Sequence, residues 1–481
     1  MYVGLDIGTS GIKGLLLDEA MGFVATASAP LCVSRPHEGW SEQAPADWLA
    51  AIEDVMASLA ASAPNALRAV QSIGLSGQMH GLVALDARGD ILRPAILWND
   101  VRNGEEASAL DSATDDFRVI GGNAVMPGFT APKVSWLAHH EPEMFAKMAH
   151  ALLPKDYVRF VLSGERLSDM SDASGTLWLD VGKRDYSDQL LGHCGLTRAQ
   201  MPQLVEGSQP AGRLKGDIAQ RWGIKGRPII AGAGDNAAAA CGLGVVEAGD
   251  GFISLGTSGV VFVVTDDFAP AADSGAHAFC HALPDKWHQM GVILSATDSL
   301  NWLSEITNHS VSALAEAAAS IDMTKARPYF HPYLSGERTP HNDANARGGF
   351  IGLSRSHSIA EMAFAVMEGV AFALADCVRV LQDAGSHPTR FIATGGGARN
   401  HQWLQMIADV TGCEIDLPIQ GDYGAALGAA RLGALATGQS QEAILTKPAI
   451  ERVFKADSAY HDAYQARYQT WQRLYQAVKD I

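Results

Sequence analysis

Two short turns of nearly the same sequence lie about half a chain apart. Ile7-Gly8-Thr9-Ser10-Gly11 stands between two apolar runs near the N-terminus, and Leu255-Gly256-Thr257-Ser258-Gly259 stands between two others. Such flanking runs predict a strand on either side of each turn. Each turn also heads one half of the chain, which makes chance recurrence a poor explanation. We therefore predict two domains of common ancestry that face one ligand.

The length and the order of the expected elements agree with this division. At 481 residues the chain is too long for one ordinary core. We place the boundary within Gly244–Asp250, which gives an N-terminal domain over residues 1–244 and a C-terminal domain over residues 245–481. A helix with Pro45 near its first turn and a buried strand over Ala69–Leu75 follow an opening meander of strands. This alternation predicts an α/β fold. The three runs of the meander are Tyr2–Leu5, Ile12–Leu17 and Phe23–Ala29.

The first turn carries groups suited to a phosphate. Gly8 and Gly11 permit backbone conformations in which successive N–H groups converge on one anion. Asp6, at the end of the first strand, could face a cation held by that anion. Taken alone, the turn fits a phosphate-and-magnesium loop and an ordinary hairpin about equally well, because glycine turns between strands are common.

A second acidic residue lies at a strand-to-helix junction. The apolar run Pro228–Ala231 leads to Asp235 and then to an alanine-rich segment. A carboxylate at such a junction can take a proton from a hydroxyl that attacks phosphorus, because open α/β sheets bind ligands there. The alternative is that Asp235 only caps the helix, and the local sequence by itself favours the cap.

Three further clusters are candidates for binding. Gly395-Gly396-Gly397 stands between a strand and a helix that begins near Asn400, where bare backbone can approach a nucleotide. Gln78-Met79-His80 and Trp98-Asn99-Asp100 each follow a strand and combine apolar faces with hydrogen-bonding groups, which suits a polyhydroxylated ligand. A buried structural histidine and a core tryptophan are the alternatives for His80 and Trp98.

Charge and composition exclude several classes of partner. The net charge is −17, which argues against a nucleic-acid or anionic-membrane surface. A bound ATP would therefore need local backbone donors and a metal ion. No apolar run is long enough to span a membrane, and the chain enters a strand at once, so we expect a cytoplasmic location. The six cysteines form no C-x-x-C pair, and no dinucleotide fingerprint, P-loop or protein-kinase motif set occurs.

These motifs occur in the order seen in the FGGY family of carbohydrate kinases, which includes glycerol, gluconate, ribulose and xylulose kinases. The resemblance covers nearly the whole chain. Gly128–Trp136 resembles one family signature, and Gly348–Leu353 with the helix through Gly369 resembles the other. Within the family the chain looks most like the bacterial xylulose kinases, through Gly77–Gly81, Leu153–Tyr157 and Pro332–His341 among other segments. Glycerol kinases instead have Gln-Arg-Glu at the position of Gln78-Met79-His80, which argues against glycerol.

The resemblance implies two actin-like (ribonuclease H-like) ATPase domains related by duplication, with a cleft between them. It implies that ATP phosphorylates the terminal O5 hydroxyl of D-xylulose, with Asp235 as the base and Asp6 orienting Mg²⁺ directly or through water. It also implies a small-molecule sugar and ATP as ligands, and a homodimer. Another sugar of the same family and a non-kinase actin-like ATPase remain the alternatives. The implied sugar-binding residues are Met79, His80, Trp98, Asn99, Asp100 and Asn236, and the implied phosphate- or nucleotide-binding residues are Gly8, Thr9, Ser10, Lys13, Gly256, Thr257, Gly395, Gly396 and Asn400.

Overall fold

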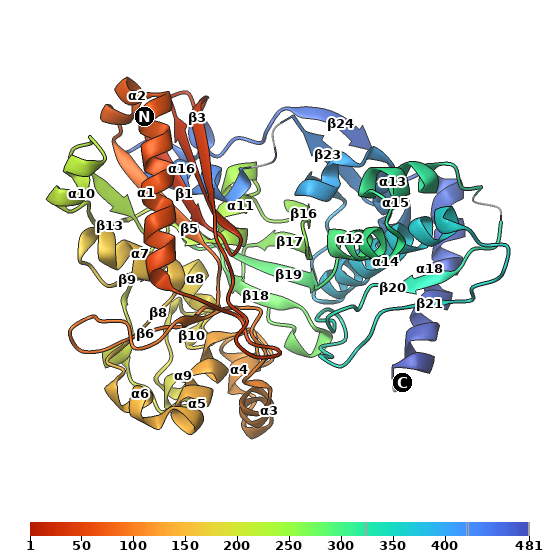
Figure 1. Cartoon of the computed structure of the whole chain (residues 1–481), viewed down its shortest axis with the longest axis horizontal. Coiled ribbons are helices and arrows are strands. Elements are labelled where there is room, and N and C mark those ends of the chain that lie inside the picture. The colour runs from red at the N-terminus through yellow and green to blue at the C-terminus, as the bar shows by residue number, and fades with distance from the viewer. Residues whose placement is uncertain (323–324, 420, 422, 480–481) are drawn as a thin grey trace.

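The computed structural model describes residues 1–322, 325–419, 421 and 423–479. Two lobes lie side by side, with the N-terminus at the upper left and the C-terminus at the lower right of Figure 1. Each lobe is built on a seven-stranded mixed sheet. The predicted α/β class is confirmed.

The N-terminal sheet begins with the predicted meander, in which β1 (Tyr2–Ile7), β2 (Gly11–Leu17) and β3 (Phe23–Pro30) pair antiparallel. The next strand, β5 (Ser72–Gly77), pairs parallel with β1. It starts three residues later than predicted, because Ala69 and Val70 close hydrogen-bonded turns after the preceding helix. The sheet is completed by β13 (Pro210–Arg213), β14 (Pro228–Ile230) and β15 (Ala233–Gly234).

The C-terminal sheet repeats this plan. β16 (Gly251–Leu255), β17 (Gly259–Thr265) and β19 (Trp287–Ile293) form an antiparallel meander, and β22 (Arg390–Thr394) and β23 (Glu414–Pro418) continue it in parallel. The order β3-β2-β1-β5-β14 in the first sheet thus matches β19-β17-β16-β22-β23 in the second. The two glycine turns join equivalent strands, which confirms the predicted duplication. The outer strands are β18 (His277–Cys280) and β24 (Ile450–Phe454).

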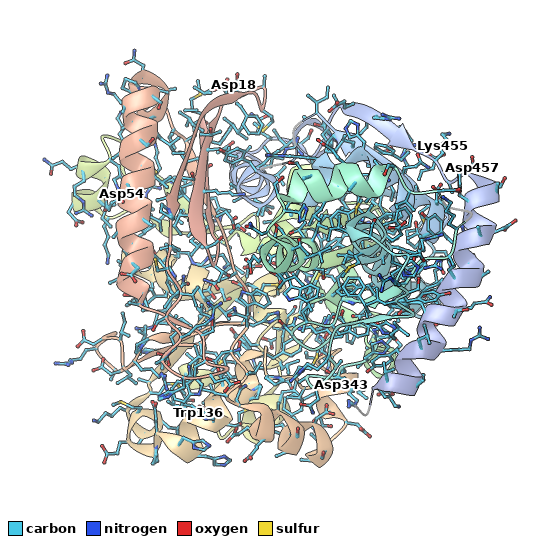
Figure 2. The ribbon with its side chains drawn as sticks, turned by 45° about the vertical axis from the view of Figure 1, so that its right-hand side comes forward. Asp18, Asp54, Trp136, Asp343, Lys455 and Asp457 are labelled. Carbon is cyan, nitrogen blue, oxygen red and sulfur yellow. The ribbon has the colours of Figure 1, made fainter. Side chains whose placement is uncertain are left out.

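Helices cover both sheets, and side chains cap the starts of several of them. Ser358 and Glu361 form a capping box at the start of α14 (Ile359–Asp383). Asp457, at the start of α18 in Figure 2, accepts a hydrogen bond from the backbone N–H of Ala459 at 2.9 Å. The other helices are α1 (Pro45–Ser62), α2 (Pro64–Arg68), α3 (Gly104–Ala113), α4 (Asp116–Val119), α5 (Thr130–His140), α6 (Pro142–Lys147), α7 (Pro154–Ser163), α8 (Met170–Ser174), α9 (Asp188–His193), α10 (Gly216–Arg221), α11 (Asp235–Leu243), α12 (Thr297–Thr307), α13 (Val311–Ala319), α15 (His401–Thr411), α16 (Gly424–Leu435), α17 (Gln441–Ile444) and α18 (Ser458–Val478).

One helix crosses between the halves. α16 belongs to the second half of the sequence, yet it packs against β1, β5 and α11 of the first, where Figure 1 shows it within the left lobe. The contact is close, because a Cβ atom at Gly74 would lie 1.8 Å from the carbonyl oxygen of Ala429. The boundary predicted after residue 244 therefore does not coincide completely with the boundary between the two lobes.

The short two-stranded sheets pair β4 (Glu42–Gln43) with β7 (Ala95–Ile96), β6 (Val83–Leu85) with β8 (His150–Leu152), β9 (Leu167–Asp169) with β12 (Gln203–Val205), β10 (Leu179–Asp180) with β11 (Asp185–Tyr186), and β20 (Tyr329–His331) with β21 (Gly349–Ile351).

Candidate active site

The register of the first sheet brings its two key carboxylates to one edge. Asp6 on β1 is paired with Ser76 on β5, and Ser76 is paired in turn with Ala233 on β15. Asp235 follows Ala233 by two residues and therefore lies just beyond the carboxyl end of β15. The Ser76 hydroxyl donates to Oδ1 of Asp6 at 3.0 Å. Parallel strand pairing therefore places both acids at the end of the sheet where α/β proteins bind ligands.

Asp235 is the first residue of α11, and its side chain does not cap the helix. Gly234 occupies the N-cap position, and the Asp235 Oδ1 atom accepts from the backbone N–H and the side chain of Asn236 at 2.8 and 3.1 Å. Gly234 has to lack a side chain, because a Cβ atom there would lie 2.8 Å from Cγ of Met79. The cap interpretation of Asp235 is therefore wrong.

The surroundings of Asp235 make it a weak acid. Burial raises the pKa of Asp235 to about 7, and the negative charge of Asp6 contributes in the same direction. Burial also raises the pKa of Asp6, while Ser76 and Lys13 oppose that shift. A carboxyl group with a pKa near neutrality accepts a proton readily at physiological pH, which is the property that a general base needs.

Asp235 opens into a cavity of about 210 Å³ that both halves of the chain line. Six of the residues predicted for the site meet there, namely Met79, His80, Trp98, Asp235, Asn236 and Gly256. Its other lining residues are Phe129, Ser254, Ser258, Val260, His277, Phe279, Met290, Val292 and Arg338. The sequence analysis assigned no role to this second set. Phe129 and Arg338 lie in motifs that carried the family resemblance, whereas His277 and Phe279 lie on a strand without a distinguishing pattern.

His80 presents an acceptor to the cavity. Its φ angle of 68° and its hydrogen bond from Nδ1 to the carbonyl oxygen of Gly175 (2.8 Å) fix the ring. Burial lowers the pKa of His80 well below its usual value, so the ring is neutral at pH 7. Because Nδ1 donates to a carbonyl, Nε2 carries the free lone pair and can accept a hydrogen bond from a hydroxyl.

The first glycine turn is joined to the cavity wall by a chain of hydrogen bonds. Nε1 of Trp98 donates to Oγ1 of Thr9 at 2.8 Å, and Thr9 donates to Oε1 of Gln78 at 3.0 Å. Gln43 then accepts from Gln78 and donates to the carbonyl oxygen of Thr9. Both the hydroxyl and the carbonyl of Thr9 are thus held from within the lobe, so the turn has a fixed shape. Gly8 closes the turn by donating to the carbonyl oxygen of Gly11 at 3.2 Å.

The second glycine turn is held in a similar way. The carbonyl oxygens of Gly256 and Thr257 accept from the N–H groups of Thr297 and Ala296 at 3.0 and 2.8 Å. Since those carbonyls are engaged at the start of α12, the N–H side of the turn is the side suited to an anion. Gly395 lies against it, because a Cβ atom there would lie 3.0 Å from the amide nitrogen of Gly256.

A larger cavity of about 700 Å³ adjoins this turn on the C-terminal lobe. Gly396, Asn400 and Thr297 line it, and Thr297 also contacts Gly256. Oδ1 of Asn400 caps α15 by accepting from the N–H of Trp403 at 3.1 Å. The cavity is therefore placed to hold the remainder of a nucleotide whose phosphates lie at the turn.

Some of the predicted site residues lie outside the lining of the cavity that contains Asp235. Ser10, Lys13 and Thr257 are exposed, and Nζ of Lys13 is 5.8 Å from the ring centroid of Tyr423. Asp100 is fully buried away from the cavity, where it accepts from the N–H of Ser41 and pairs with Arg102. The predicted place of Asp100 in the sugar pocket is wrong, because both of its oxygens serve this internal network. Asn99 is partly exposed and lies outside the cavity lining.

A buried group of charges supports the segment that leads from β14 to Asp235. Nζ of Lys155 lies 2.6, 2.8 and 3.5 Å from carboxylate oxygens of Asp156, Asp169 and Asp172, and all four side chains are fully buried. Lys155 also donates to the carbonyl oxygen of Ala231 at 3.4 Å. Among the described residues, these three acids form the one group of side chains with the spacing of a metal site. The Lys155 ammonium already fills its centre, so this cluster is structural.

Asp6 fits the manner in which proteins hold Mg²⁺ for phosphoryl transfer. Mg²⁺ is usually bound by one or two carboxylates together with water and substrate phosphates. Asp6 lies near the end of β1, directly before the first glycine turn, and has one oxygen, Oδ1, bonded to Ser76. Its chemistry therefore suits the ion without a dedicated cage of protein ligands.

A duplicated actin-like fold, two anion-suited turns and a carboxyl group of raised pKa in a polar cavity define a kinase that acts on a hydroxylated small molecule. The N-terminal domain description of the FGGY family of carbohydrate kinases matches residues 1–242, and the C-terminal domain description matches residues 251–437. The chain belongs to the FGGY family of carbohydrate kinases.

Several relatives resemble the chain over its full length. It is 48% identical to the xylulose kinase of Escherichia coli (strain K12), over 99% of both chains, and 45% identical to that of Klebsiella pneumoniae, over 100% of both. A crystal structure described as a xyloylose kinase from Brucella ovis is 49% identical and superposes with a TM-score of 0.95, covering 99% of each chain. The xylulose kinase of Rhodospirillum rubrum is 29% identical, with a TM-score of 0.90 over 99% of this chain and 98% of that one. Within the described part of the chain, no helix has the length and apolar character needed to cross a membrane.

Proposed function

We propose that the chain transfers the γ-phosphoryl group of ATP to the O5 hydroxyl of D-xylulose, giving D-xylulose 5-phosphate and ADP. The observation that carries the proposal is the position of Asp235, a carboxyl group with a pKa of about 7 in a cavity lined by Met79 and His80. The similarity to xylulose kinases over the full length supports this sugar over ribulose, gluconate or another family substrate.

Each residue around the sugar has a separate role in this proposal. Asp235 takes the proton from O5 as that oxygen attacks phosphorus. Nε2 of His80 accepts a hydrogen bond from a sugar hydroxyl, while Met79 and Trp98 supply apolar contact. Asn236, next to Asp235, is placed to bind the hydroxyl that neighbours O5. These assignments follow from the cavity lining and from the tautomer of His80.

The phosphates of ATP lie between the two glycine turns in this proposal. Gly8, Thr9, Ser10 and Lys13 approach the transferred group from one side, and Gly256 and Thr257 from the other. Gly395, Gly396 and Asn400 contact the adenosine portion in the adjoining cavity. Mg²⁺, when bound beside Asp6, neutralises phosphate charge and polarises the transferred group. We also propose a cytoplasmic homodimer, with a domain division after residue 244.

A phosphorylation screen tests the proposed substrate. Purified protein is given MgATP with D-xylulose, D-ribulose, D-gluconate or glycerol, and ADP release and sugar phosphate are both measured. We expect the highest kcat/KM with D-xylulose. The Asp235→Ala variant should lose at least about 10²-fold in kcat while binding ATP normally, because a general base contributes that much.

Three outcomes would contradict the proposal. A higher kcat/KM for another acceptor would reassign the sugar. ATP turnover that does not depend on any sugar would favour a non-kinase actin-like ATPase, since that class needs no base for a sugar hydroxyl. Near-normal turnover by Asp235→Ala would remove the assignment of the base.

A further inference from the structure

The cavity contains a cationic side chain that forms no ion pair with another described residue. Arg338 reaches it from the C-terminal half of the chain. Among the described residues, its guanidinium makes no hydrogen bond or ion pair, and its aromatic neighbour is Trp98, whose ring centroid lies 5.8 Å from Cζ. Burial lowers the pKa of Arg338 to about 10, so the group remains charged at neutral pH. Arg338 is only partly buried, so its guanidinium donors are accessible from the cavity and free to bind a ligand there.

The backbone around Arg338 is held rigidly on both sides. Thr339 exchanges two hydrogen bonds with Val292 of β19, each of 3.0 Å. The Glu337 carboxyl accepts from the backbone N–H groups of Leu294 and of Arg338 itself at 2.9 and 2.8 Å. Burial raises the pKa of Glu337 to about 8, although the charge of Arg338 opposes that shift, and the two side chains form no ion pair. The position of the guanidinium is thus built into the fold.

The same loop is tied to the outer helix of the lobe. Glu337 and Asp343 exchange two backbone hydrogen bonds of 2.8 Å, and the hydroxyl of Tyr475 on α18 donates to Oδ2 of Asp343 at 3.2 Å. Figure 2 shows Asp343 beside the lower part of α18. The loop is therefore anchored at β19 and at α18, and Arg338 projects from between these anchors.

A glycine in the opposite half makes room for the guanidinium. A Cβ atom at Gly128 would lie 2.5 Å from Nη2 of Arg338 and 3.0 Å from the carbonyl oxygen of Trp98. Any larger residue at position 128 would displace the guanidinium. Gly128 and Arg338 come from different domains, so the cavity acquires this shape only when both halves are assembled.

His277 supplies a complementary acceptor beside Arg338. Its Nδ1 lies 2.8 Å from Oδ1 of Asn123, and Nδ2 of Asn123 donates to the carbonyl oxygens of Gly121 and Ala278. Since the amide group of Asn123 is oriented by those two bonds, Nδ1 of His277 is the donor. Its Nε2 atom is buried, lacks a hydrogen-bond partner among the described residues, and belongs to a ring that lines the cavity. Burial lowers the pKa of His277 to about 3, so this nitrogen remains an acceptor.

We infer from the charges that act on each group that Arg338 and His277 lie at the end of the cavity away from Asp235. The Arg338 charge is among the causes that lower the pKa values of His80 and His277, whereas the charge that acts on Asp235 is that of Asp6. A five-carbon ketose that presents O5 to Asp235 would extend its C1–C2 end toward Arg338. Such a ketose must be open-chain, because ring closure would consume O5, and it therefore carries a free carbonyl at C2.

We propose that Arg338 and His277 form the subsite that recognises the carbonyl end of the acceptor ketose. Arg338 donates to the C2 carbonyl oxygen, and Nε2 of His277 accepts from the hydroxyl at C1. This inference rests on the proposed phosphorylation of a ketose and assigns the residues that distinguish it from a polyol. A carbonyl oxygen only accepts hydrogen bonds, so it is matched by a fixed cationic donor.

The test compares a ketose with the polyol that lacks the carbonyl. For the wild type and Arg338→Met, kcat/KM for D-xylulose, the inhibition constant of xylitol against D-xylulose and the KM for ATP are measured. We expect kcat/KM for D-xylulose to fall about 10- to 100-fold, as for the loss of a charged hydrogen bond. Xylitol affinity should change less than about threefold, and the KM for ATP should stay the same. Arg338→Lys should restore part of the loss, and Arg347→Met, an exposed arginine of the same loop, serves as the matched control.

Gly128→Ala provides a second variant that leaves Arg338 in the sequence. It should cause the same selective loss, and it should add little in the Arg338→Met background because the guanidinium it displaces is already absent. The proposal would be overturned by equal losses for ketose and polyol, or by an unchanged preference for the ketose over the polyol. A loss that appears mainly in the KM for ATP would also overturn it. Should the wild type prefer another ketose, the proposed sugar fails, and the same comparison is made with that ketose and its polyol.

Discussion

Asp6 and Ser254 occupy equivalent positions before the two glycine turns. Asp6 is opposite Lys13 across its turn and beside Ser76, whereas Ser254 is opposite Val260 and beside Thr394. The duplication therefore preserved the backbone but kept the acid on one side only. That side also carries Asp235, so the charges proposed to act on phosphate and metal are concentrated in the first half.

This asymmetry predicts unequal effects of matched substitutions. Asp6→Ala should lower kcat at least about 10²-fold, because it removes the group proposed to orient Mg²⁺, whereas Ser254→Ala should lower kcat less than about tenfold. Steady-state kinetics with MgATP and D-xylulose measure both, with thermal melts to confirm folding. Equal losses would contradict the division of roles between the turns.

The raised pKa of Asp235 also predicts an effect on stability. An acid whose pKa is higher in the folded than in the unfolded state destabilises the fold as pH rises from its ordinary value of 3.8 toward 7. Asp235→Asn should therefore increase the free energy of unfolding, more at pH 8 than at pH 5, while it lowers kcat. Urea titrations at the two pH values measure this. A variant that is less stable than the wild type at pH 8 would show that the burial of this carboxylate has no cost.

At the scale of elements, α16 shows how one helix joins the halves. Its backbone approaches the sheet so closely that Cβ atoms at Gly4 and Gly74 would lie 2.0 and 1.8 Å from carbonyl oxygens of Ala426 and Ala429. On its other side, a Cβ atom at Gly428 would lie 1.7 Å from the carbonyl oxygen of Ala238 on α11. Since α11 begins at Asp235, the position of the base depends on this glycine-lined packing.

Gly74→Ala should therefore be strongly destabilising. The added methyl group would meet backbone, which cannot rotate away, so we expect a loss of about 1–3 kcal/mol or more in the free energy of unfolding. Gly216→Ala is the matched control, because a Cβ atom there meets nothing within 4 Å. Denaturant unfolding of both variants measures the difference, and a Gly74→Ala protein as stable as the control would refute the close packing.

At the scale of the whole molecule, the two lobes share their cores. One buried cluster combines residues of β1 and β2, such as Tyr2 and Leu15, with Ala426 and Ala430 of α16 and Ile444 of α17. The active-site cavity is likewise lined from both halves. The repeat in the sequence is therefore better evidence of common ancestry than of two independently folded domains.

We expect the fragment 1–244 to fail to fold on its own, because it lacks α16 and leaves the faces of β1 and β5 uncovered. Circular dichroism and urea unfolding should show no cooperative transition for this fragment. Co-expression with residues 245–481 should restore a folded complex. A cooperative, monomeric fragment 1–244 would mean that α16 contributes little to the first lobe.

The sequence by itself determined the duplication, the α/β class, the two glycine turns and the place of Asp235 after a strand, because each depends on local patterns and on motifs of short range. The role of Asp235 as the base came from the family resemblance, since the local pattern favoured a helix cap. The sequence also indicated Met79 and His80 beside a strand end. Only the tertiary structure decided which distant groups meet. It removed Asp100 from the pocket by pairing it with Arg102, and it placed α16 on the other half's sheet. It also brought Arg338 over Gly128, a contact between segments more than two hundred residues apart, which depends on the packing of the lobes and on no local pattern.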